Sequence, residues 1–306
     1  MQADKIIVLD EGRIVESGTH AELLANAGVD AVLTDNTNGT FTWQDGYHSV
    51  LNAWGDARLD GVDTPKLSFM LPFAGGKDTA VQLRNIYQDI FRPGDYHDQW
   101  FYWDGKPVII AVKEECTPEC REFFNIKMSQ WPNEPDKLGG WPWMDFQWPS
   151  RLFRSAYDFD GAAISVSIAQ HSGTVAFSDS SLYNNHTNRG RSFWAEKRSN
   201  DKILQQRYDE WKADPSLTMQ GLNFQAQFDR AIDTDAMYIL VTGWNEWVAQ
   251  RQPTNDNSIF FVDTASMEFS RDSEMMRGGY FDNYYIQLAY NIQKAKGAAP
   301  VVVQDA

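Results

Sequence analysis

The sequence predicts an α/β fold, and within that class a (β/α)8 barrel of the TIM type. Short apolar runs alternate with amphipathic helical patterns across residues 27–298, which is the strand–helix repeat of such barrels. Several runs are apolar on both faces, as strands of a parallel sheet are when both faces are covered. The alternative, a doubly wound open sheet, is disfavoured because no glycine-rich phosphate turn follows any of the runs.

The first 26 residues predict a separate β-hairpin and short helix. Lys5–Leu9 and Arg13–Glu16 are two strand patterns joined by a turn. Thr19 and Glu22 then have the spacing of a capping box, which opens a helix. We therefore divide the chain into residues 1–26, a barrel over 27–298 and a C-terminal tail over 299–306.

The barrel region contains apolar runs that we expect to form its strands. They are Ala31–Asp35, Leu67–Phe73, Val108–Val112, Phe124–Gln130, Trp143–Trp148, Ala163–Ala169, Tyr238–Trp244 and Ile259–Asp263. Amphipathic helices are expected where apolar residues recur at helical spacing. The expected apolar faces are Leu83, Ile86, Tyr87 and Ile90; Leu204, Tyr208 and Trp211; and Tyr284, Leu288 and Ile292.

The charge balance and the apolar pattern exclude two classes of partner. The chain has 27 Lys+Arg against 42 Asp+Glu, a formal net charge of −15. This balance argues against a nucleic-acid partner, because phosphates require clustered basic residues. No apolar run approaches the roughly 18 residues of a membrane span, so we expect no such span. The first residues also lack the pattern of a signal peptide.

Motifs for several chemistries are missing from the sequence. It contains neither the Gly-x-Ser-x-Gly elbow nor the Gly-x-x-x-x-Gly-Lys phosphate loop. Cys116, Cys120 and the 5 His do not form a zinc pattern, although calcium held by loop carboxylates stays an alternative. We therefore expect no cofactor. The 12 Trp are in excess, and such rings either stack on sugars or fill a core.

Polar residues lie at the carboxyl ends of the expected strands, where barrel enzymes place their active sites. These residues are Asp35, Asn36, Thr37, Asn38, Glu114, Glu115, Asp145, Gln147, Gln170, His171, Asn245, Glu246 and Asp263. Each of them alone could be a cap, a loop salt bridge or a solvated strand end. Their shared location favours a catalytic site.

Glu246 is the first catalytic candidate. It is flanked by Trp244 and Trp247, and partial burial between the rings would raise its pKa and suit it to general-acid work. The neighbouring Asn245 could hydrogen-bond a sugar hydroxyl. The structural alternative is an ion pair between Glu246 and an arginine such as Arg251.

Cleavage of a glycosidic bond needs a second carboxyl group. The candidates are Asp35, Glu114, Asp145 and Asp272, and Asp35 ranks first because its run ends cleanly at the expected barrel mouth. We expect substrate contacts from Asn38, Trp143, Asp145, Gln170, His171, Arg191, Trp244 and Asn245. His171 orients a hydroxyl or is structural, and Arg191, with Arg189, clamps an acidic sugar or faces water.

Two segments resemble known families. Residues 3–25, ADKIIVLDEGRIVESGTHAELLA, resemble the end of an ABC-transporter ATPase domain. That family's phosphate loop, signature motif and metal-binding Asp have no counterpart in the remaining sequence, so the resemblance does not imply ATP hydrolysis. The segment is a fusion, a start-site error or a coincidental hairpin, and an ATPase fragment remains the remote alternative, for which we would expect nucleotide binding.

Residues from about 20 to 297 resemble bacterial glycoside hydrolases of the family 71 and 99-like group. The matching pieces are AGVDAVLTDNTNG (27–39), YWDGKPVII (102–110), VTGWNEWVAQR (241–251) and residues 261–297. The resemblance implies a TIM-type barrel that acts on glycosidic bonds of a poly- or oligosaccharide, in a secreted or periplasmic setting. It supports Glu246, Asp35 and Asn38 as site residues. Relatives carry an additional N-terminal stretch with the first barrel strand, so it also implies an incomplete barrel here.

The sequence thus predicts a glycoside hydrolase with a carbohydrate substrate, in which Glu246 and Asp35 are the catalytic carboxyl groups. The main alternative is a carbohydrate-binding relative of the same fold that does not turn over its ligand. The sequence does not choose the sugar, the linkage or the stereochemical outcome.

Overall fold

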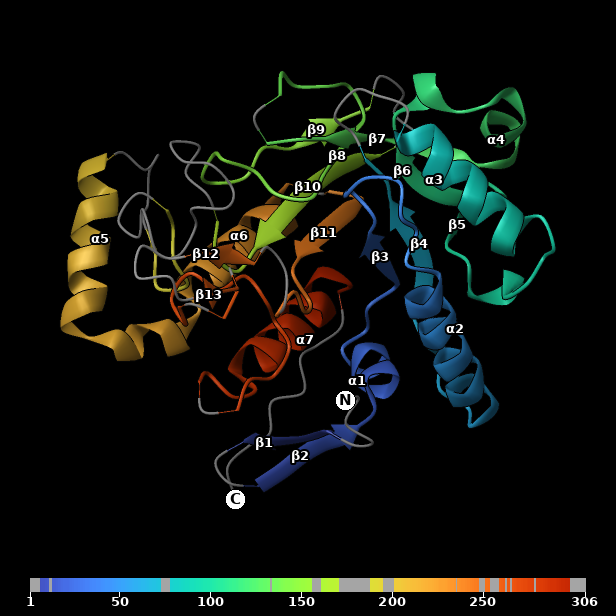
Figure 1. The fold of residues 1–306 in the computed structure, drawn as a ribbon. Helices are drawn as coiled ribbons and strands as arrows, with labels where there is room; N and C mark the ends of the chain where they lie inside the picture. The colour runs from blue at the N-terminus through green and yellow to red at the C-terminus, as the bar shows by residue number, and fades with distance from the viewer. Residues whose placement is uncertain are drawn as a thin grey trace. The chain divides into compact units, whose positions relative to one another are not determined.

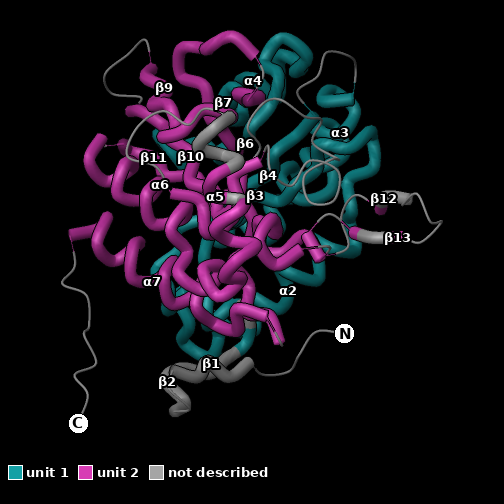
Figure 2. The backbone as a smooth tube through the Cα atoms, turned by 90° about the vertical axis from the view of Figure 1, so that its left-hand side faces the viewer, with its two compact units in different colours: residues 1–129 teal, residues 130–306 magenta. Residues whose placement is uncertain are grey.

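A computed structural model of the chain describes residues 6–10, 13–72, 78–132, 134–155, 161–170, 188–194, 201–234, 236–247, 251–253, 259–261, 263–264, 266–277 and 279–297. The chain forms two compact units, residues 1–129 and 130–306 (Figure 2). The division falls inside the region that the sequence predicts as one barrel.

Unit 1 contains the elements from β1 to β7, which are labelled in Figure 1. They are β1 (Ile6–Asp10), β2 (Arg13–Gly18), α1 (His20–Asn26), β3 (Ala31–Asp35), α2 (Gln44–Leu59), β4 (Lys66–Met70), α3 (Asp78–Ile86), a π-helical turn (Tyr87–Phe91), β5 (Tyr102–Trp103), β6 (Lys106–Ala111), α4 (Pro118–Phe123) and β7 (Asn125–Gln130). Short 3-10 turns cover His97–Gln99 and Lys113–Glu115.

The predicted hairpin and capped helix at the start of the chain are confirmed. β1 pairs antiparallel with β2. At the start of α1, the backbone N–H of Glu22 donates to the Thr19 hydroxyl at 3.4 Å, and the N–H of Thr19 donates to the Glu22 carboxylate at 2.6 Å. This reciprocal pair satisfies two of the helix's free N-terminal donors.

A parallel sheet forms the centre of unit 1, with the strands in the order β3-β4-β6-β7. β6 is buried along all but its first residue, as predicted for a strand covered on both faces. β3 lies at one end of this order and is only partly buried. The helices α2 and α3 lie on the same side of the sheet (Figure 1), and Leu83, Ile86 and Ile90 turn inward as expected.

Unit 2 contains a second set of strands and helices. They are β8 (Gly140–Pro142), β9 (Phe153–Arg154), β10 (Ala162–Ser167), α5 (Asp201–Ala213), a 3-10 helix (Pro215–Gln220), α6 (Leu222–Asp233), β11 (Tyr238–Thr242), β12 (Gln252–Pro253), β13 (Ile259–Phe260) and α7 (Asn283–Ala295). β10 and β11 pair in parallel from Ala163 and Tyr238 onward, and β9 pairs antiparallel with β10.

The core of unit 2 packs β10 against α6 and α7. Every residue of β10 is buried, and its Ile164 and Val166 belong to one buried cluster with Phe224 and Phe228 of α6 and Tyr284 of α7. The expected inward face of α7 is thus confirmed. The same core fixes the end of β11, because Val241 and Trp244 pack against the cluster.

One predicted strand is wrong, and another is shorter than predicted. Residues 143–149 form bends and irregular backbone rather than a strand, because the Asp145 carboxylate accepts the backbone N–H groups of Gln147 and Arg151 that a strand would use. The expected strand Ile259–Asp263 is reduced to β13, which pairs antiparallel with β12 as a small hairpin.

The structure therefore shows a mixed α/β fold with parallel strands in both units. A complete barrel is not shown by the described residues. Among them, no helix has both the length and the apolar character needed to cross a membrane.

Candidate functional site

Four ionisable side chains gather at the carboxyl end of β11 in unit 2, and we call them the carboxylate cluster: Glu246, Asp263, Arg271 and Asp272. The backbone brings them together. The carbonyl oxygen of Gly243 accepts the N–H of Ser273 at 3.1 Å, and that of Trp244 accepts the N–H of Glu274 at 3.0 Å. The segment after Arg271 is thereby fixed alongside the end of the strand.

Gly243 permits this close approach. Its φ is +86°, and a Cβ atom there would lie 2.3 Å from the carbonyl oxygen of Arg271. A glycine is therefore required both by the backbone conformation and by the space.

Arg271 is the centre of the cluster. Its guanidinium is 2% exposed and donates to both carboxylate oxygens of Asp263, at 3.1 and 2.7 Å. It also contacts Glu246 at 3.4 Å. Burial lowers the pKa of Arg271, but the charge and hydrogen bonds of Asp263 outweigh burial and raise it overall. Arg271 is thus a permanently charged, buried anchor for two carboxylates.

Asp272 is the carboxyl group whose surroundings differ most from water. It has no exposed surface, and the backbone N–H of Glu246 gives its carboxylate at most a weak hydrogen bond. Burial, followed by the charges of Asp263 and Glu246, raises the pKa of Asp272 to about 8. At neutral pH it is consequently a neutral acid.

Glu246 is the accessible member of the cluster. Its side chain is 32% exposed, whereas those of Asp263 and Asp272 are fully buried. Trp244 packs on the core of unit 2, and the indole N–H of Trp247 donates to Glu274. Asn245 is exposed. The structural alternative for Glu246, an ion pair with an arginine such as Arg251, is present in part, with Arg271 as the partner.

Asp35 lies in unit 1, at the carboxyl end of β3, and is exposed there. Its carboxylate accepts the N–H of Thr37 at 2.8 Å, which turns the chain toward the exposed Asn38. Gln82 holds the following loop in place, because its side-chain amide donates to the carbonyl oxygens of Asn36 and Gly39 at 2.7 and 2.6 Å.

Two exposed aromatic residues after Asp35 were missed by sequence reasoning. Phe41 is 63% exposed and Trp43 is 57% exposed, and their rings meet edge to face with centroids 4.9 Å apart. Trp43 has a left-handed backbone, φ +56°. The available signal was the position of two aromatic residues in a polar loop after a strand, where rings have no core to fill.

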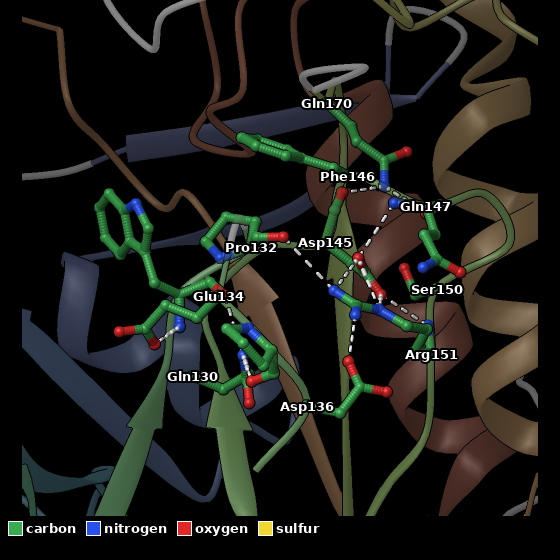
Figure 3. Close-up of polar contacts among 12 residues, drawn as sticks. Gln130, Pro132, Glu134, Asp136, Asp145, Phe146, Gln147, Ser150, Arg151 and Gln170 are labelled. Atoms are coloured by element: carbon green, nitrogen blue, oxygen red, sulfur yellow. Dashed lines mark hydrogen bonds and ion pairs between the residues drawn. The ribbon is translucent and has the colours of Figure 1, made fainter. Parts of the chain in front are cut away.

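Asp145 holds a loop together in unit 2. It is fully buried, and Arg151 binds both its oxygens, with Nε–O distances of 3.1 and 2.9 Å. Figure 3 shows the same guanidinium between the carboxylates of Asp145 and Asp136 and close to the carbonyl of Pro132. A sugar hydroxyl could reach Asp145 only by displacing these donors, so its observed role is structural.

Gln170 and the two loop arginines are buried as well. The Gln170 amide donates to the carbonyl oxygens of Asp145 and Gln147 (Figure 3). Arg189 is 5% exposed and donates to the Phe146 carbonyl oxygen at 2.8 Å, and burial lowers its pKa to about 10. None of these side chains presents a surface to a ligand.

Arg191 is fully buried between two tyrosine rings, whose centroids lie 3.9 Å (Tyr280) and 4.0 Å (Tyr284) from its guanidinium carbon. It donates to the hydroxyl of Ser270 and the carbonyl oxygen of Asp272. The expectation that Arg191 clamps an acidic sugar requires a guanidinium in the solvent. Its cation–π sandwich instead supports the backbone behind the carboxylate cluster.

The remaining expected site residues are dispersed. Trp143 is partly buried against the ring of Trp131 at 5.3 Å. Glu114 is exposed at the carboxyl end of β6 in unit 1. His171 lies outside the described residues. Cys116 and Cys120 are both buried free thiols.

No group of three or more His, Cys, Asp or Glu in the described part of the chain has the arrangement of a metal site. In the carboxylate cluster, the charge that balances the carboxylates is the Arg271 guanidinium. Comparisons of the chain with protein-family models, with curated proteins and with solved structures found no match.

Proposed function

We propose that this protein is a glycoside hydrolase and that Glu246 is the carboxylate that meets its substrate. The observation that carries the proposal is the contrast in exposure within the carboxylate cluster. Asp263 and Asp272 are fully buried, whereas Glu246, at the carboxyl end of a parallel strand, is one third exposed and is held by a buried arginine. A preorganised carboxylate open to the solvent is what hydrolysis of a glycosidic bond requires.

The parallel strands support the same proposal, since they are compatible with parts of a (β/α)8 barrel. Asp35 and Glu246 both follow the carboxyl end of a parallel strand, β3 in unit 1 and β11 in unit 2. In a barrel those ends surround one active site. We therefore propose a complete barrel in which both carboxyl groups contribute to one active site.

The surroundings of Glu246 favour a particular role. The guanidinium of Arg271 lies 3.4 Å from the Glu246 carboxylate and holds it in place, so we assign Glu246 as the nucleophile or as the base that takes a proton from water. This differs from the general-acid role expected from its tryptophan neighbours. The second carboxyl group then donates a proton to the leaving oxygen, and Asp35 is its first candidate.

The test is hydrolysis by Glu246→Gln, Asp35→Asn and a matched control, Asp45→Asn, an exposed carboxylate in the first turn of α2. The panel of substrates is α-mannan, α-glucan and plant glycans. We expect each of the first two variants to lose about 10²- to 10⁴-fold in kcat and the control to keep full activity. Azide should restore turnover to Glu246→Ala if Glu246 is the nucleophile or base, because the anion replaces the carboxylate. Unchanged hydrolysis by Glu246→Gln refutes the assignment.

A carbohydrate-binding protein without turnover is the second candidate, and the exposed pair of Phe41 and Trp43 favours it. Aromatic faces in the solvent bind the apolar faces of sugars without any catalysis. In that case the wild-type protein binds a glycan from the panel without hydrolysing it. Trp43→Ala should then weaken binding, whereas Glu246→Gln should leave it unchanged.

A further inference from the structure

Unit 1 contains a pocket that the proposed hydrolytic site does not use. It has a volume of about 490 Å³, and its lining includes Tyr87, Trp100, Tyr102, Glu119, Glu122 and Phe123. This volume is within the range of small-molecule sites, roughly 300–1,000 Å³.

The pocket lies at the opposite end of the parallel strands from Asp35 and Glu114. Its lining includes Pro107, at the start of β6, and Phe123, which ends α4 just before β7 begins. These positions are the amino ends of parallel strands. The candidate catalytic carboxylates of unit 1 follow the carboxyl ends, so the pocket is a separate site.

Four aromatic rings line this pocket. Trp100 and Tyr102 are stacked, with centroids 6.1 Å apart and planes 28° apart. Phe123 meets Tyr87 edge to face at 5.1 Å. Tyr102 is 42% exposed, whereas Trp100 is 5% exposed, so of these two stacked rings the ring of Tyr102 is the accessible one.

The polar groups of the lining are almost all acceptors. Glu119 and Glu122 are exposed carboxylates. The Tyr87 hydroxyl is used to donate to Glu119 at 3.1 Å, and the indole nitrogen of Trp100 is buried beneath the surface. Among the side chains that line the pocket, the Tyr102 hydroxyl is the remaining donor at the surface.

This inventory discriminates between two kinds of ligand. A sugar offers hydroxyl groups that need both donors and acceptors, and the lining side chains supply few donors. An alkylated ammonium ion needs only negative charge and π faces, and both are present. The ammonium of Lys106 donates to the backbone carbonyl of Glu122 at 2.5 Å, and Lys106 is not among the lining groups. The charge of Arg92 acts on Tyr87, but Arg92 is not among the lining groups either.

From this charge complementarity we propose that the pocket binds a trimethylammonium group of a small soluble compound, of which choline is the simplest probe. The methyl groups contact the exposed ring of Tyr102, which is stacked on the buried ring of Trp100, while Glu119 and Glu122 balance the charge. Aromatic surfaces with adjacent carboxylates are the usual means of recognising such cations.

The test is titration of the full chain with choline, followed by calorimetry and tryptophan fluorescence. We expect saturable binding, and we expect the uncharged carbon isostere dimethylbutanol to bind at least about five-fold more weakly, since it lacks the Coulomb term. Glu119→Gln combined with Glu122→Gln should weaken choline binding by a similar factor. Tyr102→Phe should retain binding because it keeps the π face, whereas Tyr102→Leu should lose it.

Asp60→Asn, an exposed carboxylate at the end of α2, is the matched control and should leave choline binding unchanged. Three results overturn the proposal: equal affinity for choline and its isostere, displacement of choline by methyl glucoside with comparable affinity, or binding to phosphatidylcholine vesicles without binding to free choline. All measurements are made without a glycan substrate. The outcome is therefore independent of whether Glu246 catalyses hydrolysis.

Discussion

The carboxyl group of Asp272 is buried without a strong hydrogen bond, next to two further carboxylates. Burial and the charges of Asp263 and Glu246 raise its pKa to about 8. An acid with a raised pKa in the folded state binds a proton on folding. Between about pH 4, the pKa in the unfolded chain, and the folded value, the unfolded chain loses this proton while the folded protein keeps it. The free energy of unfolding therefore falls as the pH rises through this range.

Asp272→Asn should remove this pH dependence, because the amide resembles the neutral acid in shape and cannot ionise. We expect the variant to gain stability relative to the wild type as the pH rises from about 4 to about 8, by at least about 1.4 kcal/mol, the equivalent of one pKa unit. Urea unfolding of both proteins at several pH values measures the difference. A difference that is constant across this range contradicts the assigned state of Asp272.

Arg271 is the second residue whose removal has a defined consequence. Arg271→Met leaves Asp263 fully buried without its guanidinium partner, and we expect a loss of about 3–5 kcal/mol in the free energy of unfolding. The double variant Arg271→Met with Asp263→Leu removes both charges and should recover part of that loss. If the double variant is as unstable as the sum of the two single variants, the pair is not coupled as the structure indicates.

At the scale of residues, the sequence identified some members of the site and not their grouping. The Trp-Asn-Glu-Trp motif is sufficient to select Glu246, and Asp272 was among the possible second carboxylates. That Asp272 is buried while Glu246 is accessible depends on Gly243 and the segment packed against it. Arg191 was misjudged for the same reason, since a sequence cannot show two tyrosine rings enclosing a guanidinium.

At the scale of elements, the end of β11 depends on a glycine. Gly243 and Gly61 have nearly equal φ angles, +86° and +89°, but a Cβ at Gly61 has nothing within 4 Å, whereas one at Gly243 meets the Arg271 carbonyl at 2.3 Å. Gly61→Ala should cost about 1–2 kcal/mol from backbone strain alone. Gly243→Ala should cost more than about 3 kcal/mol and should also reduce hydrolysis, because the Asp272 segment must move.

Thermal and urea unfolding of the two alanine variants measure this contrast. Equal destabilisation would show that the clash at Gly243 is relieved without displacing the segment. In that case the close approach at Gly243 does not hold the Asp272 segment in place.

Strands and caps with a local cause were predicted well, whereas those decided by distant partners were not. β3 has the predicted limits, Ala31–Asp35, and the capping box of Thr19 and Glu22 depends on residues only three apart. The run Trp143–Trp148 has the apolar composition of a strand, but Asp145 and Arg151 impose a loop on it. The backbone conformation of this run therefore depends on side-chain hydrogen bonds, which the apolar pattern does not show.

At the scale of the whole molecule, the charge of −15 predicts a response to salt. Excess negative charge repels itself in the compact state, and salt screens this repulsion. Raising NaCl from about 10 to about 150 mM, which shortens the Debye length from about 30 to about 8 Å, should increase the urea midpoint. A double variant, Glu114→Gln with Asp60→Asn, carries less negative charge at two exposed positions and should respond less. A midpoint that falls with salt contradicts the prediction.

The sequence alone is sufficient to predict the α/β class, the N-terminal hairpin and capped helix, most strand positions and Glu246 as a candidate residue. These features follow from alternating composition and from neighbours a few residues apart, which act locally. The tertiary structure alone decided which polar side chains are accessible. It buried Asp145, Gln170 and Arg191, joined Asp263 to Arg271 and left Glu246 open. Burial and charge pairing depend on segments distant in sequence, and no local pattern encodes those contacts.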